Sequence, residues 1–142
     1  MSSKKIRAFL NTDVLLEYIR GKAELRELFS EEVRARAAFA TNDVVLQELL
    51  LACGKNPGTD LAVIVPYLEV LTASLDLRPT DAQALRTLRN RVVHVNDVLI
   101  LAGARSCDVL LTYDDELLEV GDIAAVRSET PEAFLHELGA AA

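Results

Sequence analysis

Four acidic residues stand out in this sequence because each lies within or directly after an apolar segment. They are Asp13, Glu48, Asp97 and Asp114, and they come from widely separated parts of the chain. Burying a carboxylate without a partner costs several kcal/mol of free energy, so the four acids are expected to share a positively charged partner. Mg²⁺ or Mn²⁺ is a suitable common partner, since both favour a few carboxylates plus waters. The four acids therefore predict a metal site with positions left for phosphate oxygens.

Two polar residues beside these acids are further candidates. Asn11 lies two residues before Asp13, and its amide oxygen can bind a hard cation without adding charge. Asp13 either supplies that charge from the same strand end or only caps a helix that begins at Val14. Thr112 lies two residues before Asp114. It is either an ordinary strand residue or a hydroxyl that hydrogen-bonds a carboxylate or a bound water.

The hydrophobic pattern alternates between strands and helices. Short apolar or alternating runs predict strands over 6–10, 37–41, 74–78, 109–112 and 123–126. Helical spacing and capping residues predict helices from 14 to about 20, from 42 or 43 to 52, over 60–71, from 80–81 onward, from a cap at Asn96 to about 105, and from Pro131, with one or two solvated helices in 22–36. This order predicts an α/β fold with a mostly parallel sheet covered on both faces. Ligand sites in such sheets form beyond the carboxyl ends of the strands.

The composition predicts one domain without a membrane segment. A chain of 142 residues that is 51% hydrophobic can build a full core, so a single domain over 1–142 is expected. The longest apolar stretch, Leu61 to Leu71, is interrupted by Pro66 and Glu69 and is shorter than the roughly 18 residues of a membrane helix. No secretory signal pattern follows the N-terminus, so a cytoplasmic location is expected.

The net charge of −7 is unevenly distributed. Residues 1–113 hold 14 acids and 14 bases, whereas residues 114–142 hold 8 acids and only Arg127 as a base. The first part of the chain is therefore free to carry a local basic surface for nucleic acid. Arg86, Arg89 and Arg91 on one expected helix are either a solvated face or phosphate contacts.

The order and context of the candidate residues resemble the PIN-domain family of metal-dependent ribonucleases, and within it the VapC-type toxins of toxin–antitoxin pairs. The family typically has a first strand ending in Asp-Thr-Asn or Asp-Ser-Asn before Val-Leu, then a helical Glu, a helical Asp and a Thr-x-Asp. The matching segments are Asn11-Thr12-Asp13-Val14-Leu15, Glu48, Asn96-Asp97 and Thr112-Tyr113-Asp114. The resemblance covers nearly the whole chain, but Asn11 stands where the family has its first Asp.

This resemblance implies a three-layer α/β/α sandwich and an endoribonuclease that uses Mg²⁺ or Mn²⁺ on an RNA substrate. Asp97, Glu48 and Asp114 would bind the metal directly or through water, while Asn11 and Asp13 would share the remaining position. The resemblance also implies a cognate antitoxin and, together with the high apolar content, a homodimer.

Two other interpretations remain open from the sequence. The chain is alternatively a degenerate PIN-like module that binds RNA or a protein without cleavage, because Asn11 brings no charge. It is alternatively a phosphate-transferring enzyme of the receiver or phosphatase type, which also gathers Asp at strand ends. The helical positions of Glu48 and Asp97 disfavour this last alternative.

Overall fold

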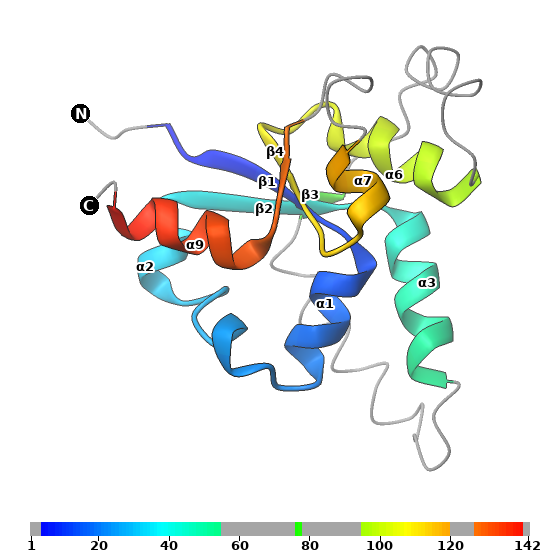
Figure 1. Ribbon diagram of the computed structural model, residues 1–142, viewed down its shortest axis with the longest axis horizontal. Coiled ribbons are helices and arrows are strands. Elements are labelled where there is room, and N and C mark those ends of the chain that lie inside the picture. Colours follow the sequence, from blue (N-terminus) through cyan, green and yellow to red (C-terminus); the bar gives the residue numbers. More distant parts are fainter. Residues whose placement is uncertain (1–3, 55–75, 78–94, 120–126, 141–142) are drawn as a thin grey trace.

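A parallel sheet of five short strands forms the centre of the computed structural model, which describes residues 4–54, 76–77, 95–119 and 127–140 (Figure 1). The spatial order of the strands is β3-β2-β1-β4-β5. Their bounds are β1 Ile6–Leu10, β2 Ala37–Thr41, β3 Asp76–Leu77, β4 Val109–Leu111 and β5 Ser128–Glu129. This order of the described strands differs from the 2-1-3-4-5 order of receiver domains, so the receiver type is wrong, whereas the order does not test the phosphatase type.

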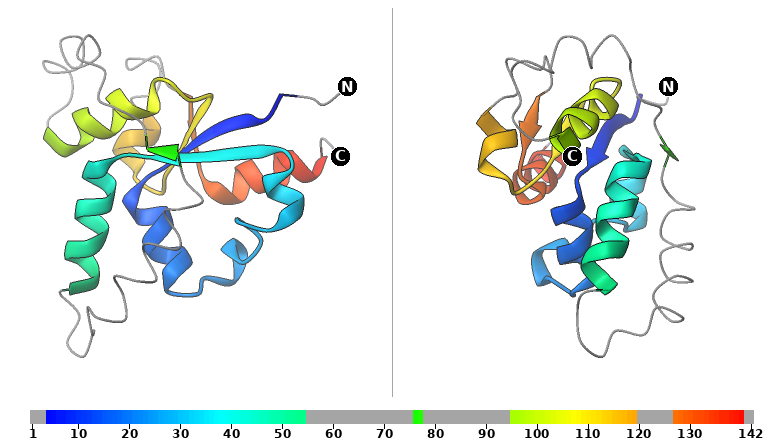
Figure 2. Two further views of the ribbon diagram at one scale, coloured as in Figure 1. Left: turned by 180° about the vertical axis from the view of Figure 1, so that it is seen from behind. Right: turned by 90° about the vertical axis from the view of Figure 1, so that its right-hand side faces the viewer.

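Helices lie on both faces of the sheet, which confirms the three-layer α/β/α architecture. The structure describes α1 (Thr12–Ile19), η1 (Ala23–Leu25), α2 (Glu31–Arg34), α3 (Asp43–Gly54), α6 (Val95–Ala104), α7 (Asp115–Glu119) and α9 (Pro131–Ala140). Figures 1 and 2 show α6 on one side of the strands and α1, α3 and α9 on the other.

Alternation along β1 and β2 explains how the two faces are filled. Phe9 is fully buried and lies against α6, since its ring would contact a Cβ added at Gly103. Phe39 pairs in register with Ala8 and therefore faces the opposite side. There its ring makes edge contacts with Phe29 and with Phe134 of α9. Residues 8–10 of the central strand β1 are thus buried on both faces, which is typical of a parallel sheet.

Several predicted elements are confirmed, and others are corrected. Strands β1 and β2 have the predicted bounds, β4 ends one residue early, and α3 and α9 begin as expected. Helix α6 begins at Val95, so Asn96 lies in its first turn and not at the predicted cap position. The 22–36 segment forms only the short η1 and α2, and α7 was not predicted. The predicted helices over 60–71 and from 80–81, with Arg86, Arg89 and Arg91, and the predicted strand over 123–126 lie outside the described residues.

Among the helices that the structure describes, none combines the length and apolar character needed to span a bilayer.

Candidate metal site

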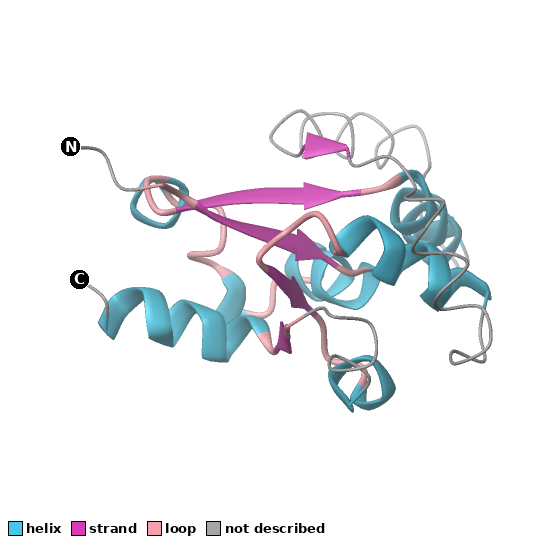
Figure 3. Cartoon of the chain, turned by 90° about the horizontal axis from the view of Figure 1, so that it is seen from above, coloured by secondary structure: helices cyan, strands magenta, loops and turns pink. Residues whose placement is uncertain are grey.

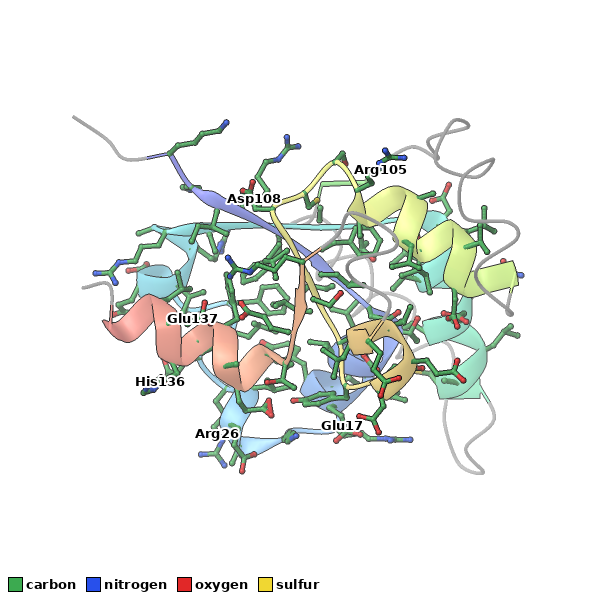
Figure 4. The ribbon with its side chains drawn as sticks, turned by 45° about the horizontal axis from the view of Figure 1, so that its top comes forward. Glu17, Arg26, Arg105, Asp108, His136 and Glu137 are labelled. Carbon is green, nitrogen blue, oxygen red and sulfur yellow. The ribbon has the colours of Figure 1, made fainter. Side chains whose placement is uncertain are left out.

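The order in which the chain adds strands to the sheet reverses between β1 and β4. From β1 the chain moves outward to β2 and β3 on one side, while β4 and β5 lie on the other. The crevice beyond the carboxyl ends at such a reversal is the usual ligand site of an open α/β sheet. Figure 3 shows the longer strands running in one direction toward this edge. Asn11 and Asp13 follow β1 there, and Thr112 and Asp114 follow β4, whereas Asp108 lies at the other end of β4 (Figure 4).

The buried hydroxyl of Thr112 joins the two strand ends. Thr112 Oγ1 accepts hydrogen bonds from Asn11 Nδ2 at 2.9 Å and from the backbone N–H of Asp114 at 3.1 Å. It donates its own proton to Asp13 Oδ2 at 3.0 Å. These three bonds use the full capacity of a hydroxyl, which has one proton and two lone pairs. Thr112 is therefore more than an ordinary strand residue, because it organises the site.

Asp13 is held by its neighbours across the sheet. Its Oδ2 also accepts from the backbone N–H of Tyr113 at 3.1 Å, whereas its Oδ1 is buried and has no hydrogen bond within the described chain. Burial raises the pKa of the Asp13 carboxyl, and the hydrogen bonds from Tyr113 and Thr112 offset part of that effect. Since α1 begins at Thr12, Asp13 lies inside its first turn. The alternative that Asp13 only caps a helix beginning at Val14 is therefore wrong.

Asn11 has the position of a helix cap but does not cap. It directly precedes α1, yet its side chain makes no capping hydrogen bond. Instead Nδ2 points to Thr112, and Oδ1 is buried without a hydrogen-bond partner among the described residues. An unsatisfied buried acceptor costs about 1–3 kcal/mol, so two of them two residues apart call for an explanation. Asn11 Oδ1 and Asp13 Oδ1 are hard oxygen donors of the kind that Mg²⁺ and Mn²⁺ prefer.

Glu48 and Asp97 lie on the helices beside this edge. Glu48 is half-buried on α3, and its Oε1 accepts a 2.6 Å hydrogen bond from the Thr12 hydroxyl. Asp97 is half-buried in the first turn of α6. Asn42 links the two helices, because its Oδ1 accepts from Val45 N–H at 3.1 Å to cap α3 and its Nδ2 donates to the Leu99 carbonyl at 3.1 Å.

Asp114 has a structural role that the sequence prediction did not include. Its Oδ1 accepts from the backbone N–H of Glu116 at 2.9 Å and of Leu117 at 3.4 Å, so it caps the short helix α7. The side chain is exposed rather than buried. Its charge still lies close enough to Asp13 to add to the raised pKa of that carboxyl.

The described residues contain no cluster of three or more acidic, histidine or cysteine side chains close enough to hold a metal ion. The structure instead joins Asn11, Asp13 and Asp114 through Thr112, and it joins Glu48 to the intervening Thr12. Convergence of all the candidate acids on one cation therefore stays a prediction.

Two residues at the site were missed by sequence reasoning. Thr12 orients Glu48, and its place between Asn11 and Asp13 was the available signal. Tyr113 donates its backbone N–H to Asp13, and its phenol donates a short hydrogen bond to Glu132 of α9. The Lys22 ammonium lies 4.1 Å from the centre of the Tyr113 ring and 3.7 Å from Glu132. Burial and Glu132 raise the pKa of the Tyr113 phenol, so it remains a hydrogen-bond donor.

Comparison with solved structures supports the architecture. No family model matches the sequence, and no curated protein matches it. The DNA-bound VapBC of Salmonella typhimurium has a chain with TM-score 0.63 and 24% identity, with 88% of this chain and 98% of that chain covered. VapBC-1 of nontypeable Haemophilus influenzae has a chain with TM-score 0.66 and 16% identity, with 88% of this chain and 98% of that chain covered. PAE2754 of Pyrobaculum aerophilum has TM-score 0.67 and 19% identity, with 96% of this chain and 99% of that chain covered.

These similarities extend over nearly the full length of each matched chain, while the sequence identities are low. They agree with the parallel order β3-β2-β1-β4-β5 and with helices on both faces. The chain therefore has the fold of the VapC-type PIN domains.

Proposed function

We propose that this protein is a metal-dependent endoribonuclease and the toxin of a toxin–antitoxin pair. The observation that carries the proposal is the pair of buried oxygens, Asn11 Oδ1 and Asp13 Oδ1, which make no hydrogen bond among the described residues. They lie at the reversal point of the sheet, where the PIN-like order of motifs also places Asp114. An oxygen-lined edge of this kind suits a hard cation and a phosphodiester.

The proposed ligands of Mg²⁺ or Mn²⁺ are Asp97, Glu48, Asp114, Asp13 and Asn11, which bind it directly or through water. When bound, the ion would activate a water for in-line attack on the phosphodiester and neutralise charge on the phosphate. The protein's part is positioning. Thr12 fixes one oxygen of Glu48, and Thr112 fixes one oxygen of Asp13, whose other oxygen makes no hydrogen bond within the described chain.

We also propose an antitoxin partner and a homodimer. Several chains with this fold come from VapBC assemblies, including VapBC2 of Rickettsia felis bound to a promoter DNA fragment. The acidic C-terminal part of the chain would suit a partner with basic residues.

A second candidate function is a PIN-like module that binds RNA or a protein without cleavage. Asn11 favours it, because the side chain that replaces the family's first Asp is a neutral amide. Fewer negative charges weaken the attraction for a divalent cation in a partly buried site.

Cleavage of a structured RNA pool by purified protein, with Mn²⁺ and then with excess EDTA, separates the two functions. We expect cleavage that EDTA abolishes. Asp97→Asn should reduce the rate by at least the roughly 10–100-fold that follows loss of an outer partner of a metal site. Glu31→Gln is the matched control, because Glu31 is also in the first turn of a helix but lies on exposed α2.

Circular dichroism should show both variants folded. Full activity in Asp97→Asn would remove Asp97 from the metal site. Absence of any metal-dependent cleavage by the unmodified protein, with RNA binding retained, would favour the non-catalytic module.

A further inference from the structure

We propose that Asn11 and Asp13 are an exchanged acid–amide pair whose members are interdependent through the single hydroxyl proton of Thr112. Asn11-Thr12-Asp13 has the reverse order of the Asp-Thr-Asn that the resemblance to PIN domains implies at this position. The inference concerns the site of the proposed function, but its test does not require cleavage.

The donors and acceptors around Thr112 show why the exchange must be paired. One lone pair of Oγ1 receives the Asp114 backbone N–H at 3.1 Å. The other receives the Asn11 amide at 2.9 Å, and the only proton goes to Asp13 at 3.0 Å. One side chain of the pair must therefore donate and the other must accept.

The same count fixes the orientation of the Asn11 amide. If the amide were turned over, Asn11 Oδ1 and Asp13 Oδ2 would both face a hydroxyl with one proton. The observed orientation satisfies Thr112 and turns Asn11 Oδ1 away from it, where it makes no other hydrogen bond in the described chain. The pair thus offers one neutral and one charged oxygen, Asn11 Oδ1 and Asp13 Oδ1, to a ligand.

Each single exchange has a definite consequence. Asn11→Asp removes the donor from Thr112 and places two carboxylates around one proton, so it should destabilise the protein. Asp13→Asn keeps an oxygen that can accept from Thr112 and Tyr113, so the fold should tolerate it while the site loses its charge. The double variant again has one carboxylate and one amide, so it avoids two carboxylates around one proton, and its effects should not be the sum of the single ones. Its recovery should be partial, because position 13 must still accept from the Tyr113 backbone N–H.

A double-mutant cycle tests the pair in EDTA by calorimetric melting. We expect Asn11→Asp to lower Tm by about 4 °C or more and Asp13→Asn to stay within about 2 °C of the unmodified protein, since about 1 kcal/mol corresponds to roughly 2–4 °C at this chain length. The Tm of the double variant should lie between those of the two single variants, because one atom at position 13 cannot both donate to Thr112 and accept from the Tyr113 N–H. In Mn²⁺ titrations we expect Asp13→Asn to raise the Kd for Mn²⁺ at least tenfold, which corresponds to about 1.4 kcal/mol of binding free energy. The double variant should recover most of that loss.

Thr112 provides the matched controls. Thr112→Ser keeps the hydroxyl and should keep the coupling, whereas Thr112→Val removes it. The effect of Asn11→Asp should then depend less on residue 13, because only the charge repulsion between the two carboxylates remains. If Asn11→Asp fails to fold while the double variant folds, the coupling is supported.

Additive Tm changes across the cycle, or equal coupling in the Thr112→Val background, would overturn the proposal. The outcome is separable from the proposed function. Coupling without RNA cleavage leaves the pair standing and removes the nuclease, while cleavage with additive variants does the reverse.

Discussion

At the scale of single residues, Asn11 and Asn42 show how context decides the role of one side chain. Each follows a central strand and directly precedes a helix. Asn42 caps α3 with its Oδ1, whereas Asn11 makes no capping bond and leaves its Oδ1 unsatisfied within the described chain. Forgoing a cap and leaving a buried acceptor unpaired each cost on the order of 1 kcal/mol. Such a departure from local preference is expected where a residue serves a ligand.

Glu129 is a second partly buried acid with an unusual environment. It lies on β5, and its side chain accepts a hydrogen bond from Arg127 at 3.0 Å. Arg127 also binds Glu137, which lies on α9 (Figure 4), at 3.2 Å. Burial raises the pKa of Glu129, and Arg127 offsets only part of that effect.

Glu129→Gln should stabilise the protein near neutral pH. The pKa of Glu129 in the folded state lies above its ordinary value of 4.5. The contribution of Glu129 to stability is therefore greatest below pH 4.5 and is lost as pH rises through the folded-state pKa. Glutamine keeps an acceptor for Arg127 without the buried charge. We expect Tm of Glu129→Gln to match the unmodified protein near pH 4 and to exceed it by about 2 °C near pH 7.5.

The exposed Glu31→Gln is the control for net charge in that pH series. A lower Tm for Glu129→Gln at pH 7.5 would show that its charge pair with Arg127 outweighs the cost of burial.

Residue types predicted the candidate site better than residue contacts. The sequence identified Asn11, Asp13, Thr112 and Asp114, and the structure joins these four by hydrogen bonds. A hydrogen bond from Thr112 to a carboxylate was one of the predicted alternatives, but the sequence predicted neither that the carboxylate is Asp13 nor that Asp114 caps α7. Those bonds depend on how β1 and β4 meet, which no local pattern specifies. Metal binding by any of these residues stays a prediction.

At the scale of elements, Gly103 sets how closely α6 approaches the sheet. A Cβ at this position would lie 2.7 Å from Asn42 Nδ2 and 3.1 Å from Phe9 Cε2. Asn42 is the residue that ties α6 to α3, and α6 carries Asp97. The absence of a side chain at Gly103 therefore permits the close approach of two elements that flank the candidate site.

Gly103→Ala should destabilise the protein although alanine is the better helix former. Helix propensity alone would favour alanine by about 1 kcal/mol, while overpacking costs about 1–3 kcal/mol. The matched control is Gly139→Ala on α9, where nothing lies within 4 Å of the added Cβ. We expect Tm to fall for Gly103→Ala and to hold or rise for Gly139→Ala. Equal Tm values for the two variants would show that α6 has room to move.

The predictability of elements follows the strength of their local signals. Strands β1 and β2 are apolar runs with clear ends. Helix α9 begins at Pro131, and the hydroxyl of the preceding Thr130 accepts a hydrogen bond from Ala133 N–H at 3.2 Å. Helix α7 has only five residues, which is too short for a periodic pattern. Its signal was the capping potential of Asp114, which the sequence reasoning assigned to the metal instead.

At the scale of the whole molecule, the order of strands is a long-range property. Residues 8–10 pair with 109–111, and neither strand carries a local signal for the other. The fold class could be predicted from alternating strands and helices, but the sequence analysis predicted no strand order. That order is what places the ends of β1 and β4 side by side.

The proposed homodimer has a candidate surface on α3. Leu50 and Leu51 are 40% and 58% exposed, and they are the large apolar side chains most exposed in the described chain. Adjacent exposed leucines on one helix are more typical of an interface than of a solvated surface. By contrast, Ile6, 36% exposed, lies at the start of β1.

We expect a dimer by light scattering at micromolar concentration, and a monomer for Leu50→Lys/Leu51→Lys. Lysine is tolerated on an exposed helix face, so the variant should remain folded while two buried charges per subunit would oppose association. Ile6→Lys is the control and should remain dimeric. If the unmodified protein is a monomer by light scattering, the homodimer proposal is wrong. A dimer that survives Leu50→Lys/Leu51→Lys would place the interface elsewhere, because a surface that tolerates two added charges without dissociating is not desolvated by the partner.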